Sequence, residues 1–185
     1  MSKITYYHSP LGWIEIQASP DAVTSVVFCD ERKDDTCNDS TILAACVRQL
    51  DEYFDGRRMN FDLPVDQKGT PFQQNVWNVL TDIPFGTTVS YADVARMLNK
   101  PQAARAVGAA NGQNKVWIIV PCHRVIGANG SLTGYAGGLE RKKWLLTHEA
   151  KIVSGLKFQV GAQTSNLKLQ TSNFTSNLKP QTSNL

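Results

Sequence analysis

The apolar positions of the first 54 residues predict strands followed by one helix. Residues 3–16 and 23–28 are rich in Tyr, Ile, Val and Trp, and Ser-Pro-Leu-Gly and Ser-Pro-Asp turn signals interrupt them. Such runs, bounded by turn residues, are typical of strands. From Asp39 to Phe54 the apolar residues recur instead at helical spacing, which predicts a helix that packs Cys46 in its buried face.

Capping signals open the sequence that follows. The stretch 56–69 is rich in turn residues and is expected to be a linker. Thr70 and Gln73 then match a capping box with a proline at the first helical position, which predicts a helix over 70–83.

Two further helices are predicted close together. The run from Ser90 to Asp93 repeats the capping signature and opens a short helix that ends near Leu98. A turn then leads into a second helix over 102–110. A short helix, a turn and a second helix make a helix-turn-helix candidate, although many such pairs in proteins do not bind DNA.

The apolar run 116–120 predicts a strand, and a glycine-bracketed loop over 134–138 precedes a predicted helix over 139–148. Together the patterns predict an α/β protein of the α+β kind. A small N-terminal strand-rich domain carries one helix, and a C-terminal helical domain carries the helix-turn-helix and an active-site strand and turn.

The expected domains are 1–67 and 68–153, followed by a tail over 154–185. The tail repeats Thr-Ser-Asn with little aromatic content, a low-complexity composition that favours disorder.

Charge is distributed unevenly, although the formal net charge is only +3. Residues 1–67 carry 6 Lys and Arg against 12 Asp and Glu, residues 68–150 carry 9 against 4, and residues 151–185 carry 4 against none. A basic segment is a plausible surface for DNA phosphates and is equally compatible with a solvated face. No stretch reaches the roughly 18 apolar residues of a membrane span, so the cytoplasm is the expected location and no membrane partner is expected.

Cys122 lies in the run Ile-Ile-Val-Pro-Cys-His-Arg-Val-Ile of residues 118–126. A thiol needs a neighbouring base or positive charge to act as a nucleophile, and His123 and Arg124 are candidates. A core cysteine beside a surface histidine is the alternative. The other cysteines are Cys29, Cys37 and Cys46. With no C-x-x-C pair and no compact Cys/His cluster, neither a metal site nor a disulfide framework is expected.

Pro-Cys-His-Arg-Val resembles the active-site signature of the O6-alkylguanine-DNA alkyltransferase family, whose members move an alkyl group from DNA onto their own cysteine. The resemblance extends from Gly69 to Glu149. The matching blocks are 70–73, 83–86, 104–108 and 134–139. The N-terminal half resembles the family more loosely, and the chain is similar to the stand-alone bacterial form.

The resemblance implies that Cys122 is the nucleophile, that His123 withdraws its proton through a water, and that Glu149 orients the imidazole in the manner of a triad. Asn114 matches the asparagine that ties the recognition helix to the active-site turn, although the usual next residue, proline, is Lys115 here. Holding the Cys122 thiol mostly ionised at pH 7 would require its pKa to be lowered by about two or three units.

The resemblance also implies that double-stranded DNA with an alkylated base binds through its minor groove, with the target nucleotide flipped out. Arg105 would fill the vacated stack, and Tyr91 would crowd the neighbouring phosphate. Small residues cover the second helix of the pair, so it can approach DNA closely but read little sequence. The other residues assigned to DNA or the base are Arg124, the Val125 carbonyl, Tyr135 and the Ala136 backbone.

The alkylated base is itself the electrophile, so the resemblance implies no cofactor. Each molecule is expected to act once, and the protein is expected to be a monomer. Three other functions are weighed against this one: a non-repairing alkyltransferase-like protein, a papain-like hydrolase and a structural helix-turn-helix protein. The first resembles this family with tryptophan where this chain has Cys122. The second would use a distant histidine, and the third leaves the cysteine, histidine and glutamate unexplained.

Overall fold

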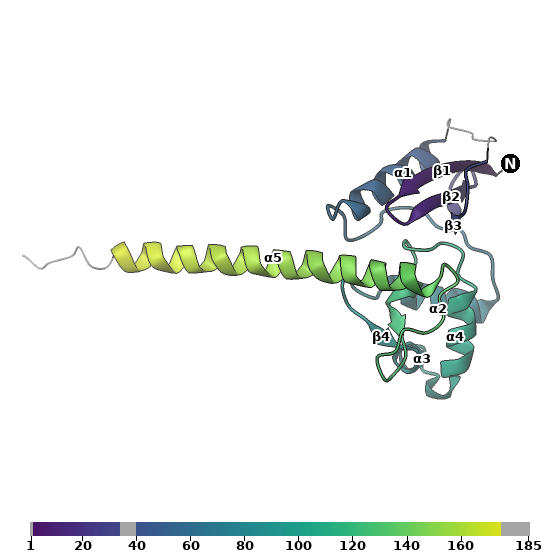
Figure 1. Ribbon diagram of the computed structural model, residues 1–185. Coiled ribbons are helices and arrows are strands. Elements are labelled where there is room, and N and C mark those ends of the chain that lie inside the picture. The colour runs from purple at the N-terminus through teal and green to yellow at the C-terminus, as the bar shows by residue number, and fades with distance from the viewer. Residues whose placement is uncertain (1, 34–39, 175–185) are drawn as a thin grey trace, which may run out of the picture.

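An antiparallel three-stranded sheet and one helix form the N-terminal part of the computed structural model, which describes residues 2–33 and 40–174 (Figure 1). Strands β1 (Lys3–Ser9), β2 (Gly12–Ala18) and β3 (Val23–Cys29) pair in sequence order. Gly12 ends the two-residue loop between the first two strands, and its φ of 103° is a conformation that favours glycine. The predicted strands are confirmed.

Helix α1 (Thr41–Phe54) packs its apolar face on this sheet. The Ser40 side chain caps its first turn by accepting from the Leu43 N–H. Cys46 is fully buried in the shared core, as predicted. The predicted start of the helix, Asp39, and the neighbouring Cys37 lie outside the described residues.

The segment between α1 and the next helix is attached to the sheet. The Val23 N–H donates to the Pro64 carbonyl at 2.8 Å, and the Asp66 N–H donates to the Val23 carbonyl at 2.9 Å. The Gln49 side chain of α1 also forms two hydrogen bonds of 2.8 Å with the backbone of Asp62. The predicted linker is therefore held against both elements of the N-terminal part.

Three helices follow, and both predicted capping boxes are present. They are α2 (Pro71–Thr81), α3 (Tyr91–Met97) and α4 (Ala104–Gly112), the last preceded by the 3-10 turn η1 (Pro101–Ala103). The Trp77 indole of α2 donates to the Ala110 carbonyl of α4 at 2.9 Å, which fixes α2 against the helix-turn-helix pair.

The predicted strand over 116–120 is wrong, because this segment forms successive turns. The Val120 N–H donates to the Val116 carbonyl at 2.9 Å, and the Ile119 N–H donates to the Trp117 carbonyl at 2.8 Å. Ile118 has a φ of 71°, which is costly for a β-branched residue. A short apolar run indicates burial but does not distinguish a strand from a buried turn.

The segment continues into the 3-10 turn η2 (Cys122–Arg124) and the short strand β5 (Val125–Ile126). Strand β5 pairs in parallel with β4 (Val89–Ser90), which directly precedes α3. This pairing was not predicted, and it places the Cys-His-Arg turn beside the start of the helix-turn-helix.

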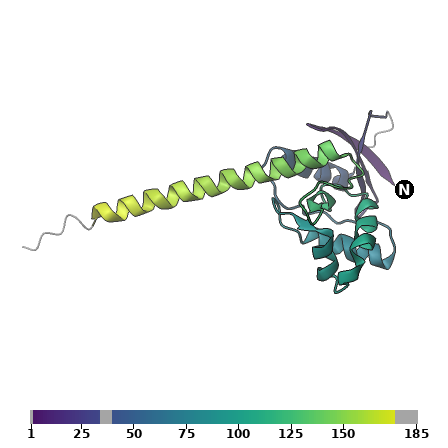
Figure 2. The same ribbon diagram turned by 60° about the horizontal axis from the view of Figure 1, so that its bottom comes forward.

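Helix α5 (Leu139–Phe174) is much longer than predicted, and its second half extends away from the rest of the molecule (Figures 1 and 2). The expected disordered tail is therefore wrong over residues 154–174, while 175–185 lie outside the described residues. No proline occurs between residues 149 and 174, and an interior glycine costs a helix only about 1 kcal/mol. Within the described ranges, no helix is both long and apolar enough to span a membrane.

Candidate active site

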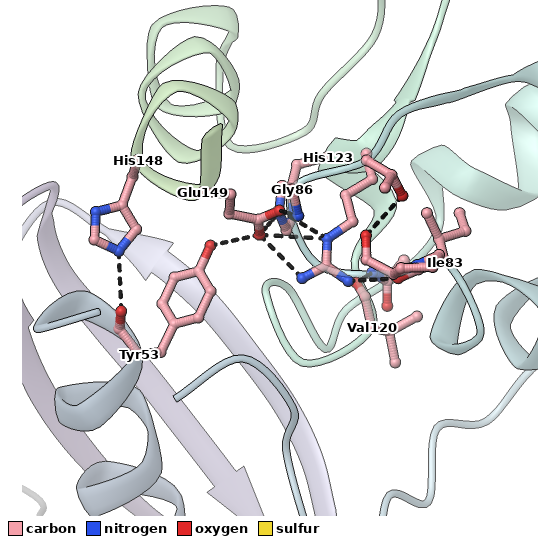
Figure 3. A network of polar contacts seen from close by, with 11 residues as sticks. Tyr53, Ile83, Gly86, Val120, His123, His148 and Glu149 are labelled. Carbon is pink, nitrogen blue, oxygen red and sulfur yellow. Dashed lines mark hydrogen bonds and ion pairs between the residues drawn. The ribbon is translucent and has the colours of Figure 1, made fainter. Parts of the chain in front are cut away.

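Glu149 is the centre of a buried polar network that joins both halves of the chain (Figure 3). Its Oε1 lies 2.8 Å from His123 Nε2 and accepts hydrogen bonds from the Tyr53 hydroxyl at 2.9 Å and from Arg124 Nη2 at 3.0 Å. Its Oε2 accepts from the Gly86 N–H at 2.9 Å and from Arg124 Nε at 3.0 Å. Both oxygens of the carboxylate are thus fully engaged.

This network sets the tautomer of His123. Although burial alone raises the pKa of Glu149, the hydrogen bonds and charges of His123 and Arg124 lower it to about 2. The ionised carboxylate can only accept, so His123 Nε2 carries the ring proton. His123 Nδ1 is then the basic nitrogen, and it has no hydrogen-bond partner among the described residues.

The imidazole is neutral in this resting arrangement. Burial, assisted by the positive charges of Arg124 and Lys142, lowers the pKa of His123 even though Glu149 acts in the opposite direction. A neutral, fully buried imidazole with an unpartnered Nδ1 is suited to accept one proton from a neighbouring acid.

Cys122, which precedes His123 in the sequence, is the candidate acid, and it is only 2% exposed. Burial raises the pKa of its thiol to about 11, against smaller lowering effects of the Asn114 side chain and the Lys142 charge. Burial therefore favours the neutral thiol in the resting protein, the opposite of the lowered pKa that a mostly ionised thiol would require. Asn114 and Lys142 are nevertheless placed to stabilise the thiolate once the proton leaves.

Asn114 holds the active-site turn together. Its Nδ2 donates to the Val120 carbonyl at 2.9 Å, and its Oδ1 accepts from the Val116 N–H at 3.0 Å. These two bonds brace the segment that contains the left-handed Ile118. The Asn114 N–H also donates to the Asn111 carbonyl of α4 at 3.3 Å, so Asn114 lies between that helix and the turn.

Lys115 stands where a proline is usual, and its backbone is held from two sides. Its N–H donates to the Gln67 side chain, and its carbonyl accepts from the Val26 N–H at 2.7 Å. A proline would lack that N–H. Lys115 therefore gives the turn a hydrogen bond to Gln67 that a proline could not make.

Lys142 was missed by the sequence analysis. It is fully buried, and its Nζ donates to the Val125 carbonyl at 2.6 Å and the Thr133 carbonyl at 2.7 Å. Burial lowers its pKa to about 8. Lys142 and Lys143 are adjacent in sequence, and only the tertiary packing decides which of the two faces the site.

Two family models match most of the chain. Residues 3–67 match the ribonuclease-like domain of 6-O-methylguanine DNA methyltransferase, and residues 71–151 match the DNA-binding domain of the same family. The chain belongs to the 6-O-methylguanine DNA methyltransferase family.

Individual relatives agree with this assignment. The constitutive methylated-DNA--protein-cysteine methyltransferase of Bacillus subtilis is 46% identical over 158 residues, covering 80% of this chain and 96% of that protein. The Mycobacterium tuberculosis O6-methylguanine methyltransferase structure has a TM-score of 0.74 at 41% identity, covering 82% of this chain and 94% of that chain. The structure of Mycobacterium tuberculosis OGT in complex with DNA has a TM-score of 0.73 at 42% identity, covering 80% of this chain and 92% of that chain.

In this methyltransferase, the loop that contains Tyr135 is tightly packed. The Tyr135 hydroxyl is buried without a hydrogen-bond partner among the described residues, and its ring lies 5.7 Å from that of Trp117. Gly137 packs so tightly that a Cβ there would lie 2.8 Å from the Tyr135 ring and 3.1 Å from Phe28. Ala136 is exposed, while the Val125 carbonyl already accepts from Lys142.

The predicted DNA contacts of the methyltransferase lie in two different environments. Arg105 is exposed on α4 and makes no hydrogen bond or ion pair within the described part of the chain. The Tyr91 hydroxyl, at the start of α3, donates to the Thr133 carbonyl at 3.1 Å. Both residues lie on the helix-turn-helix pair.

The prediction that Arg124 contacts DNA is wrong for this structure. Arg124 is 5% exposed, its Nε and Nη2 bind Glu149, and its Nη1 donates to the Ile83 carbonyl at 2.6 Å. A guanidinium with these partners balances the buried carboxylate. The residue type of Arg124 alone suggested a contact with phosphate or a base. Its ion pair with Glu149 depends on how α5 packs in the folded chain. Among the described residues no group of three or more His, Cys, Asp or Glu could hold a metal ion.

Proposed function

We propose that this protein repairs DNA by direct reversal, transferring a methyl or other alkyl group from O6-alkylguanine irreversibly to its own Cys122. Among possible substrates we include O4-alkylthymine. By reaction type it is a methylated-DNA--[protein]-cysteine S-methyltransferase that acts once. The observation that carries the proposal is the burial of Cys122, His123 and Glu149 together, with His123 Nε2 2.8 Å from Glu149 Oε1 and His123 Nδ1 without a hydrogen-bond partner among the described residues.

The proposed reaction begins with transfer of the thiol proton to His123 Nδ1, through a water as the resemblance implies. Glu149 stabilises the imidazolium, while Asn114 and Lys142 stabilise the thiolate. The sulfur attacks the alkyl carbon, the carbon–oxygen bond breaks, and its electron pair returns to guanine. The thiol proton held on His123 then passes through water to N1 of the guanine anion, which restores neutral guanine and a neutral imidazole. We propose no step that removes the alkyl group from the resulting thioether, so each protein molecule reacts only once.

We further propose that the helix-turn-helix binds the minor groove, with the damaged nucleotide flipped toward Cys122 and the protein acting as a monomer. Supporting this are the small exposed residues of α4 and the excess of basic residues in 68–150. Arg105 would occupy the vacated stack, and Tyr91 would press on the adjacent phosphate.

The flipped base would then lie against the loop of residues 134–138. Tyr135 would support the guanine, and the Ala136 N–H and the Val125 carbonyl would bond its edge. We propose domain boundaries at 1–67 and 68–153, and a cytoplasmic location, where thiols stay reduced.

Incubation with a duplex carrying one O6-methylguanine should place a single methyl on Cys122, with no more than one methyl per protein molecule. Peptide mapping by mass spectrometry measures the site, and an unmodified duplex is the control. Cys29 and Cys46 should stay unmodified because burial raises the pKa of each thiol and neither has a histidine next to it in the sequence. Repeated turnover, or a methyl on another cysteine, would falsify the proposal.

Arg105→Ala should slow repair of duplex DNA by about tenfold or more. Without the arginine, the gap that the flipped nucleotide leaves in the base stack stays empty, and unstacking costs a few kcal/mol. Reaction with the free O6-alkylguanine base should change by less than about twofold, since no stack has to be filled there. Arg96→Ala is the matched control, as Arg96 is exposed on the neighbouring helix α3 and pairs with Asp93. Equal losses on duplex and free base would assign Arg105 to folding or to the pocket instead.

A further inference from the structure

Tyr53 belongs to α1 in the N-terminal half, yet its hydroxyl reaches the carboxylate of the active site. It is fully buried and donates to Glu149 Oε1 at 2.9 Å across 96 positions of sequence. The same oxygen lies 2.8 Å from His123 Nε2. Figure 3 shows Tyr53 and His123 reaching Glu149 from different sides.

The Tyr53 ring is fixed by residues of both halves. Its centroid lies 5.6 Å from Phe61, 5.9 Å from Phe85 and 5.5 Å from His148. His148 Nε2 also lies 2.9 Å from the Tyr53 carbonyl. The Phe85 ring in turn lies 5.6 Å from the Arg124 guanidinium. The hydroxyl therefore has little freedom to leave Glu149.

The hydroxyl acts only as a donor. Burial and the adjacent Glu149 charge raise the pKa of Tyr53 well above its ordinary value, so it keeps its proton at neutral pH. Arg124 binds both oxygens of Glu149, and the Gly86 N–H binds Oε2. The contribution of Tyr53 falls specifically on Oε1, the oxygen shared with His123.

A donor on that oxygen limits how strongly the carboxylate attracts a proton on the imidazole. Negative charge withdrawn from Oε1 by Tyr53 is no longer available to stabilise an imidazolium. Without the hydroxyl, Oε1 would favour a protonated His123, and a protonated imidazole cannot accept the thiol proton of Cys122.

We propose that Tyr53 is a positioning residue for alkyl transfer: its hydroxyl holds Glu149 Oε1 against His123 and keeps the imidazole neutral, with Nδ1 available. The inference rests on the proposed function only for its rate measurement. It makes the N-terminal half a contributor to the reaction, through a contact that neither matched domain contains alone.

The test is Tyr53→Phe in the full chain, which removes the hydroxyl and keeps the ring. The first measurement is the 15N titration of His123, which is tractable because the chain has only three histidines. The pKa of His123 should rise by about one unit, the size expected for losing one charge-assisted hydrogen bond. The acidic limb of the single-turnover transfer rate should shift to higher pH by the same amount, with the high-pH plateau changing less.

Tyr7→Phe is the matched control, because the Tyr7 hydroxyl donates to Asp51 at 3.3 Å on the exposed side of α1 and its ring stacks on Phe54. It should leave the His123 titration and the rate profile unchanged. Site-specific 3-fluorotyrosine at position 53, a stronger donor of similar size, should lower the pKa of His123 and covers the case in which Tyr53→Phe folds poorly.

An unchanged His123 titration in both position-53 variants would overturn the inference, whatever happens to the melting temperature, since a merely structural tyrosine would alter stability alone. Failure of the wild-type protein to accept a methyl would overturn the proposed function instead. The histidine titration would still decide the role of Tyr53 in that case.

Discussion

Cys122→Ser is expected to abolish alkyl transfer, with a loss of at least about a thousandfold. A serine hydroxyl fills nearly the same volume in this buried position but is a far weaker nucleophile than a thiolate. Because the thiol is 2% exposed and the substitution leaves Arg105 and Tyr91 of the helix-turn-helix unchanged, DNA binding should be retained. Transfer of radiolabelled methyl from a duplex measures the first effect, and fluorescence anisotropy of the same duplex measures the second.

Cys29→Ser is the matched control for this loss. Cys29 is a partly exposed thiol at the end of β3, and its replacement should leave transfer at the wild-type rate. Substantial transfer by Cys122→Ser would require a different acceptor and would contradict the proposed reaction.

Glu149→Gln is expected to destabilise the fold by about 3–5 kcal/mol, because it leaves the buried Arg124 guanidinium without its anionic partner. It should also slow transfer by about a hundredfold or more, since the imidazolium formed on His123 loses its stabilising charge. Urea unfolding measures the stability, and single-turnover kinetics measure the transfer.

The pH dependence of stability gives a second signature of Glu149. Its folded pKa of about 2 lies below the ordinary value of 4.5. The stabilisation by the ionised carboxylate is therefore present above about pH 4.5 and is lost as the pH falls toward 2, with a size on the order of 3 kcal/mol. Glu149→Gln should lack this acid limb in unfolding measurements between pH 2 and 7.

Glu52→Gln is the control, because Glu52 pairs with Arg48 and Arg58 at the surface of α1. Surface pairs contribute little to folding, so that variant should unfold much like the wild type. A Glu149→Gln protein as stable as this control would show that the network is not an important source of stability.

The sequence by itself determined the elements whose signals are local. Thr70 with Gln73 and Ser90 with Asp93 form the predicted capping boxes, because such boxes are made by residues three positions apart. The helical spacing around Cys46 likewise predicted a buried cysteine. The signature around Cys122 pointed to the chemistry for the same reason, as nucleophile and base are neighbours in the chain.

Local patterns failed where the outcome depended on what the segment packs against. The backbone of the apolar run 116–120 is hydrogen-bonded within its own turns, by the Asn114 side chain and at a single bridge to Val26 of β3, so burial there did not imply a strand. The polar tail forms part of α5 over residues 154–174, although its composition indicated disorder.

Only the tertiary structure decided the electrostatics of the site. The burial of Cys122 raises the pKa of its thiol. Of the adjacent residues Lys142 and Lys143, it is Lys142 that is buried and places its charge near this thiol. Arg124 binds Glu149 rather than DNA, and the Tyr53 hydroxyl reaches that carboxylate from 96 positions away. Solvent exclusion and charge pairing depend on distance in space, and the folding of α1 against α5 sets those distances.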